Sequence, residues 1–168
     1  MSLFDKAVVF ATRAHRNQTR KYTGESYIMH PLAVAEIVRT VEGHTDEMLA
    51  AAVLHDVVED CDVTIDEICE QFGTVVGMYV EYCTDISRPE HGNRRVRKDM
   101  DAWHYSRGPM ESQTIKVADL IDNTADISKN DPGFWNVYKN EKWLCLNLLT
   151  KADPELWQRA RKQLKELW

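Results

Sequence analysis

The sequence predicts an all-α fold in a single domain, residues 1–168. Apolar residues recur at helical spacing along most of the chain, and no segment shows the sustained alternation of a β-strand. A chain of 168 residues is long enough for one well-filled core and short for two typical domains. The hydrophobic fraction of 43% and the charged fraction of 29% are those of an ordinary globular protein.

The first half of the chain predicts three helices. The first helix is predicted from one apolar face, which is formed by Leu3, Ala7, Phe10, Ala11 and Ala14. Polar residues 17–27 interrupt this pattern, and a second helix is predicted to begin at His30-Pro31, because proline suits a first helical position. Gly43 is predicted to end it. Thr45 can cap a third helix, which runs through the apolar residues 48–54 into the charged residues 55–60.

The remaining helices are predicted mainly from their caps. Residues 64–67 have the pattern of a capping box, which opens a short fourth helix, and Gly73 separates it from the apolar run 75–80. Residues 87–93 are predicted to form a loop, followed by a helix from Arg95 and a long helix over 109–128. Asp131-Pro132 and Asp153-Pro154 open the last two helices, because in each pair a capping carboxylate precedes a proline.

Composition and charge exclude several classes of function. The formal net charge of −6 argues against non-specific nucleic-acid binding, which needs a basic surface. No segment approaches the roughly 20 apolar residues of a membrane span. The first residues do not resemble a signal peptide, and the four cysteines form no CxxC pair, so we expect a reduced, cytoplasmic protein. Two basic clusters are either solvated faces or sites that attract a small polyanion such as a nucleotide; they are Arg13, Arg16, Arg20 and Lys21, and Arg94, Arg95, Arg97 and Lys98.

The most informative segment is residues 55–60, HDVVED, at the end of the apolar run. On a continuous helix Glu59 would lie one turn beyond His55, and Asp60 one turn beyond Asp56. Buried charges are costly unless they are paired or hold a metal. A solvated acidic helix end would explain the two acids but would not need an imidazole at the apolar edge. We therefore interpret this segment as a metal site with its own acid–base groups.

Other residues could complete the metal site. Asp119 and Asn123 share one helical face, although a lone aspartate there is more often structural, and His30 could merely help to cap its helix. Taken together, His30, His55, Asp56 and Asp119 form a set of two imidazoles and two carboxylates. Such mixed ligation suits a first-row divalent ion with positions left for water and substrate, and Mn, Fe and Zn are all compatible.

Four motifs resemble, in order, those of Rel/SpoT-type alarmone hydrolases. Residues 20–31, RKYTGESYIMHP, resemble the R-K-x-G-x-P-Y-x-x-H-P signature, and residues 51–60, AAVLHDVVED, are similar to A-L-L-H-D-V-V-E-D-T. Thr64, Phe72-Gly73 and residues 116–119 with Asn123 continue the match, which covers the chain from about Leu3 to Leu149. The resemblance implies a stand-alone HD-domain phosphohydrolase, without room for the synthetase and regulatory domains of the long Rel and SpoT proteins.

The resemblance also implies roles for particular residues. One metal, typically Mn²⁺, would be bound by His30, His55, Asp56 and Asp119. Glu59 and Asp60 would handle the attacking water, whose pKa a divalent ion lowers from about 16 toward 7. Arg20, Lys21 and Asn123 would contact the nucleotide, and Lys139 falls where relatives often carry a basic substrate contact. The implied reaction converts ppGpp or pppGpp to GDP or GTP and releases pyrophosphate.

The chain departs from the family pattern at several positions. Ser26 replaces the usual proline, Ala125 stands where many relatives carry an arginine, and Asp126 adds a negative charge. Residues 87–110 match poorly, so that Arg94 and Arg95 are only candidate substrate ligands there. An adenine alarmone, (p)ppApp, or the 2′-phosphate of NADPH is therefore an alternative substrate. A nucleotide sensor without catalysis ranks last, because no metal ligand and neither acid is lost. The oligomeric state stays open.

Overall fold

The computed structural model describes every residue, Met1–Trp168, and confirms the all-α fold class. Thr19 and Ser26 form an isolated antiparallel β-bridge. The chain divides into two compact units, Met1–Thr84 and Asp85–Trp168, which are described separately below. That residues 1–168 form one domain stays a prediction. No helix combines the length and the apolar character that crossing a membrane would require.

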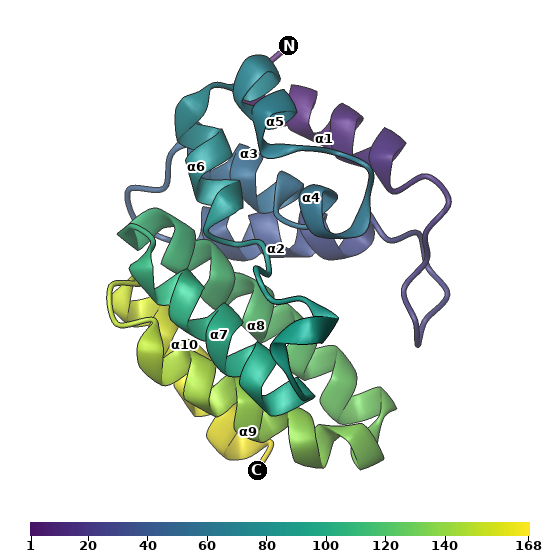
Figure 1. Cartoon of the computed structure of the whole chain (residues 1–168). Coiled ribbons are helices and arrows are strands. Elements are labelled where there is room, and N and C mark those ends of the chain that lie inside the picture. The colour runs from purple at the N-terminus through teal and green to yellow at the C-terminus, as the bar shows by residue number, and fades with distance from the viewer. The chain divides into compact units, whose positions relative to one another are not determined.

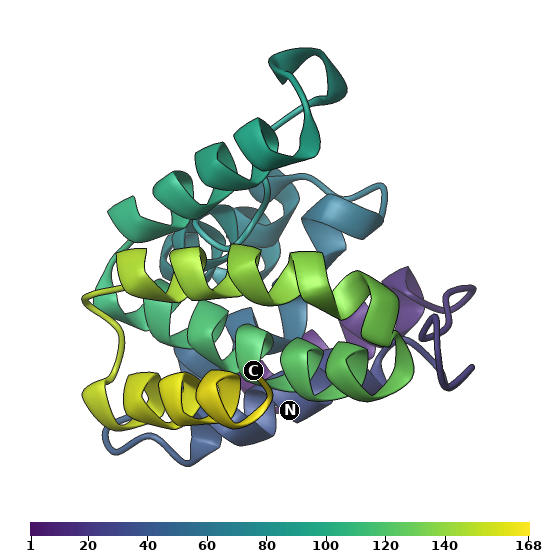
Figure 2. The same cartoon turned by 90° about the horizontal axis from the view of Figure 1, so that it is seen from below.

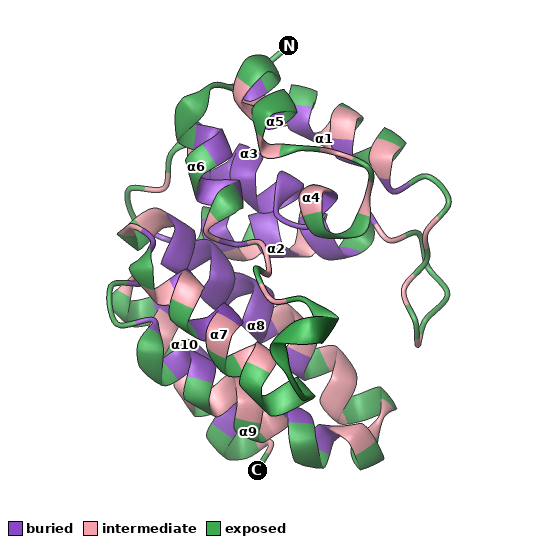
Figure 3. Ribbon diagram, in the orientation of Figure 1, coloured by how far each residue is buried: buried purple, intermediate pink, exposed green.

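Helix α3 lies at the centre of the first unit (Figure 1). It packs against α1, α2 and α6. Every residue from Met48 to Leu54 is buried, and Figure 3 shows this ribbon as continuously buried. A fully buried large aliphatic side chain contributes about 1.5–3 kcal/mol, so that this helix anchors the unit. The helices of the unit are α1 (Leu3–Ala14), α2 (Met29–Arg39), α3 (Asp46–Leu54), α4 (Val57–Asp60), α5 (Ile65–Phe72) and α6 (Thr74–Glu81).

The helix that was predicted to continue from α3 through residues 55–60 is interrupted. Helix α3 ends at Leu54, and the four-residue helix α4 begins at Val57. In a continuous helix the carbonyl of Ala52 would accept the N–H of Asp56. Here the ring nitrogen Nδ1 of His55 lies 2.8 Å from that carbonyl oxygen. The side chain of His55 thus takes the place of the backbone bond, and the chain turns at residues 55–56.

Helix α2 also differs from its prediction at both ends. It begins at Met29, so that Pro31 is its third residue and not its first. The first N–H groups of a helix have no partner within it, and proline at this position therefore removes no hydrogen bond. The helix ends at Arg39, and Gly43, with a φ of 75°, lies in the turn that follows.

The second unit is built around the long helix α8, which packs against α7, α9 and α10. Figure 2 shows α10 alongside α8 and α9. The predicted caps are confirmed: Asp131 Oδ1 accepts from Phe134 N at 3.1 Å, and Asp153 Oδ1 from Leu156 N at 2.8 Å. The elements of the unit are the 3₁₀ turn η1 (Pro89–His91), within the predicted loop, α7 (Arg94–Arg107), α8 (Met110–Asn130), α9 (Pro132–Leu148) and α10 (Pro154–Glu166).

Candidate metal centre

Three of the predicted metal ligands come together in the first unit. His30 lies in the first turn of α2, and His55 and Asp56 form the turn between α3 and α4. Asp56 Oδ2 lies 3.5 Å from His30 Nε2 and 3.1 Å from His55 Nε2. One ligand atom from each residue lies within 4.8 Å of the others. This spacing is compact enough for all three to bind one ion.

Both imidazoles are buried, and that of His55 is held in a form that can bind a metal. His30 is 2% exposed and His55 is fully buried. Because a backbone carbonyl can only accept, the 2.8 Å contact of His55 Nδ1 with the Ala52 oxygen places the ring proton on Nδ1. Nε2 then presents its lone pair toward Asp56. Metal-binding histidines are usually fixed in this way, by a bond from the second ring nitrogen to a carbonyl or carboxylate.

Tyr27 is a further member of this cluster, and its role was not predicted from the sequence. Its hydroxyl donates to Asp56 Oδ2 at 2.7 Å, and its ring centroid lies 6.0 Å from that of His30. A hydrogen bond of this kind orients a ligating carboxylate. The signal was available, because Tyr27 stands three residues before His30 in the matched motif. Imidazole nitrogens, together with the carboxylate of Asp56 that Tyr27 orients, are donors that fit a divalent first-row ion.

The acid pair Glu59 and Asp60 occupies α4. The N–H of Asp60 donates to the carbonyl of Asp56 at 2.9 Å, so that Asp60 lies one turn beyond Asp56 as predicted, although the longer helix is broken. Partial loss of hydration, and next the charge of Asp56, raise the pKa of Asp60. A hydrogen bond with Tyr27 acts in the opposite direction. Asp60 therefore holds a proton more readily than an ordinary carboxylate.

The predicted fourth ligand, Asp119, belongs to the second unit and has partners of its own there. It is 5% exposed on α8. Its Oδ1 accepts from Asn123 Nδ2 at 2.6 Å, and its Oδ2 lies 3.1 Å from Lys116 Nζ. The part of Lys116 was missed from the sequence, although its i,i+3 spacing to Asp119 could have indicated it. That Asp119 joins the metal ligands and that Asn123 contacts the nucleotide stay predictions.

The predicted basic substrate ligands are divided between the two units. Arg20 and Lys21 are in the loop between α1 and α2, where Lys21 Nζ contacts the hydroxyl of Tyr22 at 3.2 Å. Lys139, on α9, lies with its Nζ 4.6 Å from the ring centroid of Trp168. Arg94 makes a bidentate contact with Glu141, at 2.7 and 2.9 Å, and is thereby held on the surface of the second unit. The substrate roles of these residues stay predictions.

Comparison with known protein families gives one match that covers most of the chain. Residues 7–124 match the HD domain. The chain belongs to the HD domain family. The matched region contains all four candidate metal ligands and the acid pair. This family implies a divalent metal, and the cluster of His30, His55 and Asp56 is a possible site for it.

Individual relatives give the same assignment. The guanosine-3′,5′-bis(diphosphate) 3′-pyrophosphohydrolase MESH1 of Homo sapiens is 37% identical over 140 residues, which are 82% of this chain and 76% of that protein. The MESH1 of Drosophila melanogaster is 32% identical over 142 residues, 83% of this chain and 78% of that protein. A solved structure described as a metazoan ortholog of SpoT that hydrolyzes ppGpp has a TM-score of 0.86 and 25% identity, and covers 99% of this chain and 96% of its own. This HD domain chain is a metal-dependent phosphohydrolase.

Proposed function

We propose that this protein hydrolyses ppGpp and pppGpp at the 3′ position, giving GDP or GTP and pyrophosphate, with Mn²⁺ as the metal. The observation that carries the proposal is the cluster of His30, His55 and Asp56, in which Asp56 lies one helical turn before Asp60 of the acid pair. The names of the relatives support the substrate. A cytoplasmic location stays a prediction from the sequence, and the oligomeric state stays open.

The proposed metal ligands are His30, His55, Asp56 and Asp119. Bound there, the ion supplies a water of lowered pKa and positive charge beside the phosphoryl oxygens. His55 would bind as a neutral donor through Nε2, because its ring keeps its proton on Nδ1. Tyr27 holds the Asp56 carboxylate in a fixed orientation through its 2.7 Å hydrogen bond.

The proposed roles of the remaining residues follow from their chemistry. Asp60 accepts the proton of the attacking water, for which its raised pKa suits it, and Glu59 orients that water. Arg20 and Lys21 bind the nucleotide as a planar and a compact cation. Asn123 and Lys139 are the proposed contacts from the second unit. Asn123 offers a donor and an acceptor to a ribose or phosphate edge.

A second candidate substrate has a specific observation in its favour. Ala125, an exposed residue of α8 two positions after Asn123, provides no cation, and the neighbouring Asp126 is acidic. A loss of positive charge beside the proposed nucleotide contact weakens selection for one particular phosphate arrangement. We therefore retain (p)ppApp and the 2′-phosphate of NADPH as alternative substrates of the same metal site. The inactive sensor is the last alternative.

The test is product analysis with purified protein loaded with Mn²⁺, incubated in parallel with ppGpp, ppApp and NADPH. GDP and pyrophosphate from ppGpp, lost in Asp56→Ala and after chelation, support the proposal. The matched control is Asp66→Ala, which removes an exposed carboxylate from the first turn of α5 and should keep full activity. Turnover of ppApp or NADPH with ppGpp untouched would overturn the substrate and leave the metal site standing. No turnover of the three would point first to another phosphorylated substrate, and only then to the sensor.

A further inference from the structure

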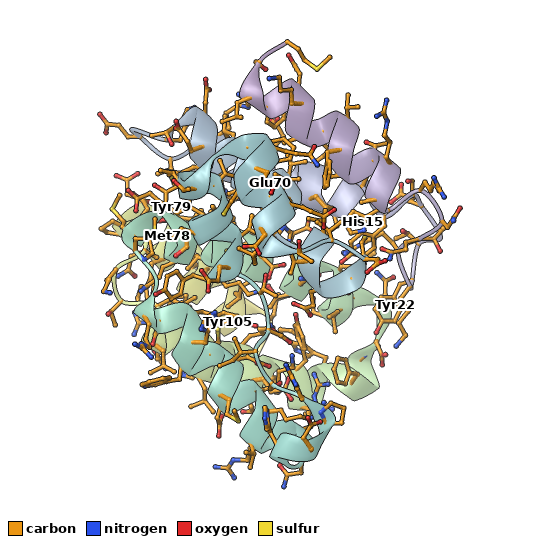
Figure 4. The ribbon with its side chains drawn as sticks, turned by 45° about the horizontal axis from the view of Figure 1, so that its top comes forward. His15, Tyr22, Glu70, Met78, Tyr79 and Tyr105 are labelled. Atoms are coloured by element: carbon orange, nitrogen blue, oxygen red, sulfur yellow. The ribbon has the colours of Figure 1, made fainter.

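The loop that carries Arg20 and Lys21 is a small hairpin, residues 18–27. Its two sides pair through Tyr27 N to Gln18 O at 3.0 Å and Arg20 N to Glu25 O at 2.8 Å. In Figure 1 this segment, between α1 and α2, extends away from the helices, and Figure 4 shows Tyr22 on it and His15 near its base. Cations on such a projecting loop can bind a phosphate reproducibly only if the base of the loop is fixed.

Gln18 connects the base of the hairpin to the acid pair. Its Nε2 donates to the backbone carbonyl of Asp60 at 2.7 Å, across 42 residues of sequence. Asp60 ends α4, so that its carbonyl has no partner within that helix. A carbonyl can only accept, and the amide nitrogen of Gln18 must therefore face Asp60 while Oε1 points away from it.

His15 fixes this orientation of the amide. Its Nδ1 lies 2.7 Å from Gln18 Oε1, and because Oε1 can only accept, the ring donates through Nδ1. His15 is 1% exposed, lies next to the end of α1, and its ring centroid is 4.7 Å from that of Tyr27. The sulfur of Cys61 lies 3.4 Å from the same nitrogen. The imidazole is thus held from several sides, and the glutamine has one arrangement available.

A second tie lies beside the first. Tyr27 pairs with Gln18 across the hairpin, and its hydroxyl donates to Asp56 Oδ2 at 2.7 Å. The two residues at the base of the hairpin therefore contact the two ends of the segment 56–60, one through a backbone carbonyl and one through a carboxylate. A movement of the hairpin would have to break one of these bonds or carry α4 with it.

We propose that Gln18 and His15 are positioning residues that hold the hairpin cations in register with the acid pair. This inference rests on the proposed function, since it takes Arg20 and Lys21 as phosphate ligands and Glu59 and Asp60 as the groups that handle water. The hydrogen-bonded base aligns the phosphate with the water before the substrate arrives. A shift of the hairpin relative to α4 would weaken substrate binding without removing any contact to the metal.

The test is Gln18→Met, which keeps the length of the side chain and removes its hydrogen bonds with His15, with the Asp60 carbonyl and, at 3.8 Å, with the Cys61 sulfur. The KM for ppGpp should rise at least about fivefold, the change expected from the loss of a single neutral hydrogen bond, while kcat stays within about twofold. The Mn²⁺ affinity measured by calorimetry should not change. His15→Phe, which keeps a ring but removes the donor, should shift KM in the same direction. A purely structural role would instead lower kcat through loss of folded protein and leave KM unaltered.

The matched control is Gln163→Met in α10. Gln163 is also half-buried, and its Nε2 likewise donates to a backbone carbonyl, that of Ile121, at 2.8 Å. Its replacement should leave KM at the wild-type value. In the background of Lys21→Ala, Gln18→Met should raise KM less than it does alone, because part of what the hairpin positions is already absent. An unchanged KM in Gln18→Met, or full additivity with Lys21→Ala, would overturn the inference.

Amide hydrogen exchange separates this inference from the proposed function. The amides of Arg20 and Tyr27, which pair across the hairpin, should exchange faster in Gln18→Met than in the wild type. In Gln163→Met they should exchange at the wild-type rate. If the wild-type protein does not hydrolyse ppGpp, the proposed function fails, and KM is measured with the nucleotide that is hydrolysed. Unchanged exchange of the hairpin amides would refute the positioning role by itself.

Discussion

Replacing Lys116 by methionine should destabilise the protein far more than the loss of an ordinary surface charge. Lys116 Nζ lies 3.1 Å from Asp119 Oδ2, and the two side chains are only 8% and 7% exposed. In Lys116→Met the carboxylate keeps the 2.6 Å hydrogen bond from Asn123 but loses its cation in surroundings that admit little water. Methionine matches the length of the lysine stem, so that the packing of the aliphatic part is largely kept.

The size of the effect follows from these contacts. Breaking a buried ion pair by removing one partner costs about 3–5 kcal/mol. The bond from Asn123 persists, which places the expected loss near the lower end, about 3 kcal/mol. Lys116 also lies 4.5 Å from the ring centroid of Tyr105 and acts electrostatically on Asp85, so that the loss should not fall below this range. In a chain of this length a change of about 1 kcal/mol moves Tm by about 2–4 °C, which gives a decrease of about 6–12 °C.

The assay is thermal unfolding followed by circular dichroism at neutral pH in the presence of a chelator. The matched control is Lys162→Met, because Lys162 makes an exposed pair with Glu166 at 3.7 Å, with side chains 78% and 65% exposed. That pair should be worth less than about 1 kcal/mol. Adding Asp119→Leu to Lys116→Met should restore much of the stability, since it removes the buried charge. Similar Tm values for Lys116→Met and Lys162→Met would refute the argument from burial.

Three further outcomes are expected. Tyr27→Phe should lower the Mn²⁺ affinity about 10- to 100-fold in calorimetry, and an unchanged affinity would contradict the orienting role. Burial raises the pKa of Asp85, but the charges of Lys116 and Lys98 outweigh it and hold the pKa below the ordinary value of an aspartate. The stabilisation by Asp85 is therefore present above that value and lost as pH falls through the lowered pKa, so that the urea midpoints of wild type and Asp85→Asn should converge in acid. Thr64→Ala, which removes the capping box of α5, should lower the free energy of unfolding in urea by about 1 kcal/mol. A loss no larger than that caused by Ser→Ala at an exposed serine outside any cap would contradict this.

The starts of the helices could be predicted from the sequence because a cap acts over three residues. Thr45 accepts from Met48 N, and Thr64 shares reciprocal bonds with Glu67, as their spacing indicates. Both contacts lie within one turn, where the backbone geometry is fixed by the helix itself. The ligand types at the site were implied in a different way, by the resemblance of four motifs, in their order along the chain, to those of one family.

The break after α3 could not be predicted from periodicity. The spacing of apolar residues in 48–60 gives no sign of the break. The turn depends on where the ring of His55 points. Its bond to the Ala52 carbonyl is a side-chain contact that competes with the helix, and helical spacing contains no information about it. The tie between Gln18 and Asp60 spans 42 residues and depends on the packing of the whole first unit.

The charges around the proposed site explain why the broken helix is useful. The turn at residues 55–56 leaves Asp60 one turn beyond Asp56 and places the Asp56 carboxylate near the Nε2 atoms of His30 and His55. Two neutral imidazoles and one carboxylate would leave a bound divalent ion with net positive charge, which would attract the phosphates of the proposed substrate. In the second unit, the charge of Asp119 is balanced by Lys116, whose Nζ lies 3.1 Å from Asp119 Oδ2. The stability of the second unit therefore depends on Asp119 either keeping this cation or being removed together with it.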